Sequence, residues 1–212
     1  MPPKKKTTAQ PNQSVRNGFG ILEALAASDG PLTTGEIGQR LGLHPSVTSR
    51  LLLTLCEMGY VHRLRRGLWT PHIGLAALSS MGMRHTPIMN CIPILEEMRR
   101  ALGLTVAIGM AWRGEVVYLF QSSWAEAVPG LGAHGAAQGS SIAQLLLADP
   151  MPDHFLLSPR PPTFTLAVPL QFAGQTFGLA VTNTPNLGHI PPPTVATLQA
   201  YARRIEALQP EG

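Results

Sequence analysis

The most constraining feature of the sequence is a Gly-Leu-His-Pro turn at residues 42–45, which separates two segments with helical patterning. Pro45 suits the first position of a helix, because the amide that proline lacks has no helical partner there. Four residues then share the spacing of one buried helical stripe: Thr48, Leu51, Leu52 and Leu55. We therefore expect a helix from Pro45 to about Met58.

Two shorter helical patterns precede this turn. Thr33 stands three residues before Glu36, the spacing of a capping box, and a short helix is expected from there to Gly42. Further upstream, an apolar series at helical spacing ends at residues 28–31, where Ser-Asp-Gly-Pro is a strong stop. The members of that series are Val15, Phe19, Leu22 and Ala26.

A basic hairpin is expected directly after the third helix. Residues 60–63 and 68–70 have strand-like patterning, and residues 64–67 between them form a turn rich in arginine. Three helices followed by a hairpin predict a winged helix-turn-helix over residues 15–71. Residues 1–14 contain three lysines and no apolar periodicity, so a disordered basic arm is expected there.

Charge is distributed unevenly along the 212 residues, whose formal net charge is +4. Residues 1–72 carry nine basic and four acidic side chains, whereas the remainder carries seven and eight. A basic domain joined to a nearly neutral one predicts a polyanionic partner for the first domain, double-stranded DNA above all. The alternative is a solvated surface with a basic tail.

The outward face of the third helix is the expected reading surface. Short hydroxyl side chains let a helix enter the major groove, and arginine can reach a phosphate or guanine. Ser46 lies near the helix start, where free amides favour a phosphate. The predicted DNA-binding residues are Arg16, Thr34, Pro45, Ser46, Val47, Ser49, Arg50, Arg63, Arg65 and Arg66. Leu53 lies on the same face and is unexplained beyond a partner contact.

The second half predicts an α+β domain with an antiparallel sheet. A linker helix over residues 72–85 leads to a helix over 86–102 and strands over 105–110 and 116–122. After a Gly-rich loop, the patterns predict a helix over 140–148 and a proline-rich connection over 149–162. A hairpin over 164–183 and a closing helix over 194–208 complete this α+β layout.

Residues 14–80 resemble the amino-terminal domain of the IclR family of transcription regulators. The resemblance rests on Leu41-Gly42-Leu43, Ser46, Arg50-Leu51-Leu52 and Thr54-Leu55. It implies DNA contacts by the third helix and the wing, and dimers built through the amino-terminal domains, with a homodimer or tetramer as the assembly. Residues 86–212 are similar to the family's GAF-like effector-binding domain, shortened within the proline-rich stretch.

The second domain has two alternative roles, either as a sensor or as a degenerate sensor kept for oligomerisation. As a sensor it would bind a small organic acid or aromatic effector, with Gly139, Ser140 and Ser141 holding a carboxylate.

Two other classes of function compete with a regulator. An enzyme built on the second domain would need a catalytic cluster, and His134, His154, Ser140 and Ser141 show no nucleophile motif or metal spacing. A winged helix that binds protein instead of DNA is the other alternative.

The remaining expectations concern ligands and location. No cofactor or metal is expected, and Cys56 and Cys91 are interpreted as buried thiols. No apolar run predicts a membrane span, so a cytoplasmic protein is expected.

Overall fold

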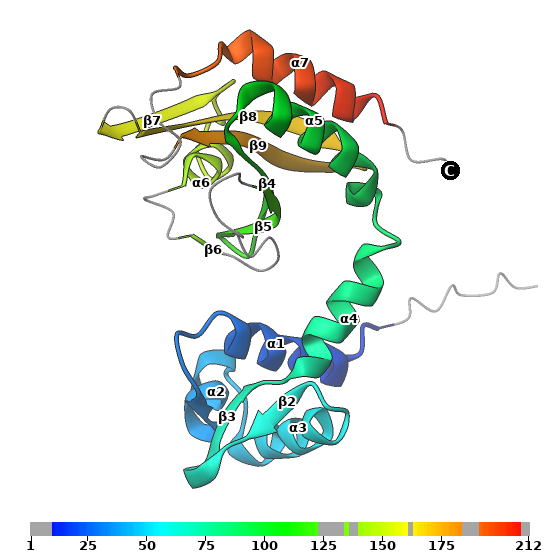
Figure 1. Cartoon of the computed structure of the whole chain (residues 1–212). Helices are drawn as coiled ribbons and strands as arrows, with labels where there is room; N and C mark the ends of the chain where they lie inside the picture. The colour runs from blue at the N-terminus through cyan, green and yellow to red at the C-terminus, as the bar shows by residue number, and fades with distance from the viewer. Residues whose placement is uncertain (1–9, 123–133, 136–139, 161–162, 184–190, 209–212) are drawn as a thin grey trace, which may run out of the picture. The chain divides into compact units, whose positions relative to one another are not determined.

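The computed structural model of the chain describes residues 10–122, 134–135, 140–160, 163–183 and 191–208 (Figure 1). Contacts between residues divide the chain into two compact units, residues 1–84 and residues 85–212. The first unit is a winged helix-turn-helix and the second is an α+β domain, so the predicted fold class is confirmed.

Three helices build the first unit: α1 (Gln13–Ala26), α2 (Thr34–Leu41) and α3 (Pro45–Glu57). The side chain of Asn12 caps α1 by accepting hydrogen bonds from the amides of Ser14 and Val15. Helix α1 therefore begins before Val15, and residues 13–14 do not belong to an arm. The helices pack around one apolar core: Ile21, Leu25, Leu32, Ile37, Leu52, Leu55, Val61 and Trp69.

A small antiparallel sheet completes the first unit. Strands β2 (Val61–Arg63) and β3 (Leu68–Pro71) pair as the predicted wing, joined through the single turn η1 (Arg65–Gly67). The two-residue strand β1 (Leu32–Thr33) pairs with the other edge of β3, a strand that the sequence patterns did not indicate. Helix α4 (Ile73–Met83) follows the wing and buries none of its residues.

The second unit is built on a six-stranded antiparallel sheet of order β6-β5-β4-β9-β8-β7. Its strands are β4 (Thr105–Trp112), β5 (Glu115–Ser122), β6 (His134–Gly135), β7 (Phe155–Arg160), β8 (Thr163–Phe172) and β9 (Gln175–Asn183). The β8–β9 hairpin turns at Ala173 and Gly174, both in the left-handed region, as expected for a tight two-residue hairpin.

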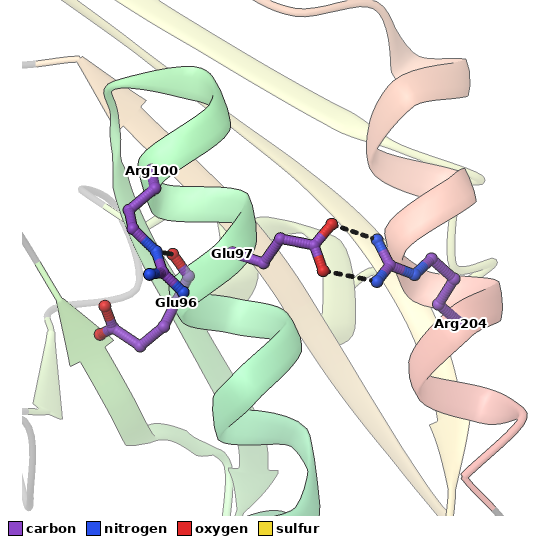
Figure 2. A network of polar contacts seen from close by, with 4 residues as sticks. All are labelled: Glu96, Glu97, Arg100 and Arg204. Atoms are coloured by element: carbon purple, nitrogen blue, oxygen red, sulfur yellow. Dashed lines mark hydrogen bonds and ion pairs between the residues drawn. The ribbon is translucent and has the colours of Figure 1, made fainter.

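Helices cover both faces of this sheet. Helices α5 (Ile92–Leu102) and α7 (Val195–Glu206) lie side by side on one face, and the short α6 (Ser141–Leu146) packs on the other (Figure 1). Figure 2 shows Arg204 of α7 reaching Glu97 of α5 with its two terminal guanidinium nitrogens. These nitrogens lie 2.7 and 2.6 Å from the two carboxylate oxygens. This bidentate ion pair joins the two helices across their exposed edges.

Two expectations for the second unit are wrong. The helix predicted over residues 86–102 is divided into a 3-10 segment, η2 (Pro87–Cys91), and α5, with a proline in the first turn of each. The stretch predicted as a proline-rich connection contains β7, an edge strand that pairs with β8. An edge position tolerates proline because one side of the strand makes no ladder hydrogen bonds.

Candidate nucleic-acid interface

The turn between α2 and α3 brings the two helices into close contact at Gly38. A Cβ atom at this position would lie 3.1 Å from both the Leu43 carbonyl oxygen and the Thr48 hydroxyl. Thr48 is fully buried, and its hydroxyl donates to the His44 carbonyl over 3.2 Å. The small residue on α2 and the buried threonine on α3 therefore set how closely the two helices approach each other.

The outward face of α3 carries the residues that the sequence predicted for it. Thr48, Leu52 and Leu55 are buried and Leu51 is half-buried, which leaves the opposite side in solvent. Val47 is half-buried at the front turn. The exposed members of the outward face are Pro45, Ser46, Ser49, Arg50 and Leu53.

The start of α3 differs from the expectation of free amides. His44 is the N-cap residue, and its imidazole Nδ1 accepts a hydrogen bond from the Ser46 amide over 3.3 Å. The amides of Val47 and Thr48 each donate to the His44 carbonyl over 3.0 Å. The first amides of the helix are therefore used within the chain, and the predicted phosphate contact of Ser46 through free amides is not supported.

The wing presents three arginines, Arg63, Arg65 and Arg66, all of them exposed. The Arg63 guanidinium lies over the Trp69 ring, 5.6 Å from its centroid, so a cation–π contact orients it on the strand. Arg66 has φ 64°, a left-handed conformation that is uncommon for a residue with a side chain. This conformation closes the tip of the wing.

Two further predicted residues lie outside α3 and the wing. Arg16 is exposed on α1, and Thr34 is half-buried at the first position of α2. The Thr34 hydroxyl accepts a hydrogen bond from the indole N–H of Trp69 over 3.0 Å. Thr34 therefore has a structural role in joining α2 to the wing strand.

An apolar groove on the first unit was not predicted. Its walls come from α1, from the end of α3 and from α4, and it encloses about 400 Å³. Val15 and Phe19 belong to it and are 54% and 59% exposed, although the sequence pattern assigns them to the apolar stripe of α1. The groove is lined by Ser14, Val15, Gly18, Phe19, Leu22, Leu51, Thr54, Leu55, Met58, Tyr60 and Leu78. Leu53 does not line it.

The effector-site residues proposed from sequence are engaged inside the second unit. Ser140 is 5% exposed, and its hydroxyl oxygen accepts from the Ala143 amide and lies 2.6 Å from the Tyr118 hydroxyl. Ser141 is 2% exposed and bonds Thr165 over 2.8 Å. Gly139 lies outside the described residues. Both hydroxyls therefore anchor α6, which does not favour a carboxylate contact.

The described residues hold no group of three or more His, Cys, Asp or Glu side chains that could bind a metal ion. Cys91 is buried, which raises the pKa of its thiol to about 11, and Cys56 is half-buried against the core. Two histidines were considered for an enzyme. His134 lies on β6, and the His154 imidazole lies beside the Asp153 carboxylate.

Among helices in the described ranges, none has the length and apolarity that crossing a bilayer requires.

The part of the chain that carries α3 and the first strand of the wing matches a known family domain. Residues 14–65, from α1 to the wing, match the IclR helix-turn-helix domain. The chain is 31% identical over 139 residues to the HTH-type transcriptional regulator BhcR of Paracoccus denitrificans, covering 62% of this chain and 49% of that protein. The chain thus spans about half the length of this curated relative.

Solved structures share the fold of the chain. An IclR family transcriptional regulator from Brucella abortus matches with a TM-score of 0.76 and 16% identity, covering 99% of this chain and 97% of that one. An IclR homolog from Microbacterium hydrocarbonoxydans, solved with 4-hydroxybenzoate, matches with a TM-score of 0.60 and 19% identity, covering 92% and 98%.

Proposed function

We propose that the protein is a sequence-specific DNA-binding transcription regulator, because residues 14–65 match the IclR helix-turn-helix domain. Helix α3 enters the major groove and the wing contacts the neighbouring backbone. The observation that carries the proposal is the outward face of α3, where Ser46, Ser49 and Arg50 are exposed within that domain.

The interface divides into reading and anchoring residues. Arg50 and the two serines reach base edges or the phosphates flanking them, because they lie on the exposed side of α3. Arg63, Arg65 and Arg66 neutralise phosphates and carry little sequence information. Thr34 contributes by holding the wing strand beside α2, and Arg16 supplies positive charge from α1.

The DNA-bound form is a homodimer that pairs through the apolar groove of the first unit. Four residues, on α1, at the C-cap of α3 and on α4, are each more than half exposed there: Val15, Phe19, Met58 and Leu78. Helix α4 continues this apolar surface with Met81, which is 61% exposed. A helix that is apolar and unburied in one chain needs a partner. A second copy satisfies this need and places two recognition helices on two half-sites.

Selection of duplexes from a random pool tests the function directly. The expected result is enrichment of an inverted repeat, with half-sites separated by about one helical turn or a multiple of it. Affinity for the selected duplex should also fall steeply with salt, by about one logarithmic unit per logarithm of salt for each phosphate contacted. Failure to enrich any sequence, together with binding that does not weaken in salt, would contradict the proposal.

The second unit serves assembly or effector binding in this proposal. The buried hydroxyls of Ser140 and Ser141 do not support a carboxylate site at those residues. A thermal-shift screen against small carboxylates and aromatic acids, 4-hydroxybenzoate included, tests effector binding, because a ligand raises the melting temperature by mass action. The curated relative BhcR is named as a transcriptional regulator, which favours this class over an enzyme.

A further inference from the structure

We propose that His44 is a specificity-determining residue of the DNA interface. Its imidazole caps α3 with Nδ1 and offers the Nε2–H group to an acceptor on DNA. The inference rests on the proposed DNA-binding function and names a residue that neither the sequence patterns nor the comparisons assign. It follows from the hydrogen bonds at the start of α3.

The hydrogen bond at Nδ1 of His44 favours one tautomer of its imidazole. Nδ1 lies 3.3 Å from the Ser46 amide nitrogen and 2.8 Å from the Ser46 hydroxyl oxygen. An amide N–H only donates, so Nδ1 must hold a lone pair. With Nδ1 accepting from this amide, the proton of the neutral imidazole lies on Nε2.

The amides at the start of α3 have no capacity left for a ligand. Pro45 has no N–H, and the Ser46 amide is taken by the imidazole. Val47 and Thr48 donate to the His44 carbonyl. The anion-binding ability of an ordinary helix start is consequently absent here, and the Nε2–H group of His44 supplies a donor in its place.

The position of His44 suits contact with DNA. The residue is exposed and directly precedes Pro45 and Ser46, the first exposed residues of the outward face. Residues at the start of a recognition helix are the ones that approach base edges in helix-turn-helix complexes. A neutral N–H donor has two kinds of acceptor there, a phosphate oxygen or the O6 and N7 atoms of guanine.

The two roles of His44, capping and contact, are separable by substitution. Serine is among the preferred N-cap residues, so His44→Ser keeps the cap but is too short to replace the imidazole donor. His44→Asn is a second capping variant, used if the serine variant does not fold. His44→Ala removes both roles and reports the cost of losing the cap.

The test measures the full-length chain and its variants on the duplex selected with the wild-type protein. We expect His44→Ser to keep the wild-type melting temperature and to bind this duplex roughly fivefold or more weakly, as for loss of one hydrogen bond. An equal loss on random duplex means that the imidazole contacts a phosphate, and it overturns the assignment of His44 as a specificity-determining residue. If the affinity difference between the wild type and His44→Ser disappears when one G·C pair of the selected duplex is changed, the acceptor is that guanine.

Wild-type affinity in a folded capping variant overturns the inference, because His44 then only caps the helix. Failure of the underlying function has a different signature. In that case the wild-type protein itself enriches no duplex, and Arg50→Ala does not alter binding. The selection with the wild-type protein comes first, and the titrations of Arg50→Ala and the His44 variants follow, so the two failures give different results.

Discussion

The indole N–H of Trp69 donates to the Thr34 hydroxyl over 3.0 Å and joins the returning strand of the wing to the first turn of α2. Trp69 is 2% exposed, and the Arg63 guanidinium lies over its ring. One buried aromatic side chain thus holds the first turn of α2 and a wing arginine in fixed relation. The wing depends on this contact because its two strands are short.

Thr34→Val should destabilise the first unit by about 1 to 3 kcal/mol, because the Trp69 N–H loses its acceptor while remaining buried. Thr34→Ser keeps the hydroxyl and is the matched control. Chemical denaturation, followed by tryptophan fluorescence, measures both. Equal stability of the valine and serine variants would show that the hydrogen bond contributes nothing.

Substitution of Gly178 tests how α6 sits on the sheet. A Cβ atom at this glycine would lie 2.6 Å from Cγ2 of Ile142, so Gly178→Ala should cost about 1 to 3 kcal/mol through overpacking. Gly30→Ala is the control, because a Cβ atom added at Gly30 would meet no other atom within 4 Å. Denaturation of both variants measures the difference, and equal stability would contradict the close packing of α6.

The same contact predicts a coupling between the two residues. Ile142→Ala removes the two nearest atoms that the new methyl group meets, Cγ2 and Cγ1, so the double variant should be more stable than the sum of the single effects predicts. Strict additivity in denaturation experiments would argue against direct packing of α6 on β9.

The ion pair between Glu97 and Arg204 predicts a pH dependence of stability. The hydrogen bond from Arg204 holds the pKa of Glu97 below its ordinary value. The stabilisation is therefore present above the ordinary carboxyl pKa and is lost as pH falls through the lowered one. Glu97→Gln should melt slightly below the wild type at neutral pH and at the same temperature in acid. A gap that persists in acid would assign the effect to something else.

The apolar groove predicts which surface mediates dimerisation. Phe19→Glu places a charge in it and should convert the proposed dimer to a monomer, as measured by sedimentation or light scattering. Leu53→Glu is a control of the same kind, because Leu53 is 54% exposed but lies outside the groove. A dimer that survives the first substitution, or dissociates with the second, would place the interface elsewhere.

Local interactions explain what could be predicted from the sequence. Both halves of the capping box are present, with Thr33 and Glu36 exchanging hydrogen bonds at 2.7 and 3.2 Å. Pro45 begins α3, and the buried stripe begins at Thr48. Each depends on residues within one or two turns of each other, so the spacing contains the information.

Contacts between distant residues explain the failures. Strand β1 has two residues and exists because β3, more than thirty positions away, pairs with it. Val15 and Phe19 are apolar like core residues but are exposed. Residue spacing cannot distinguish an apolar stripe in the core from an apolar stripe on the surface. The His44 imidazole accepts from the Ser46 amide, and the Ser140 hydroxyl accepts from the Ala143 amide. Both hydrogen bonds depend on side-chain geometry, which no sequence pattern indicates.

The affinity of Arg50→Ala for the selected duplex tests most directly whether the outward face of α3 reads DNA. Arg50 is exposed, so the variant should keep its melting temperature. We expect it to lose about tenfold or more in affinity, the size of one arginine contact with a base. Unchanged affinity in the folded variant would contradict the assignment of α3 as the recognition helix.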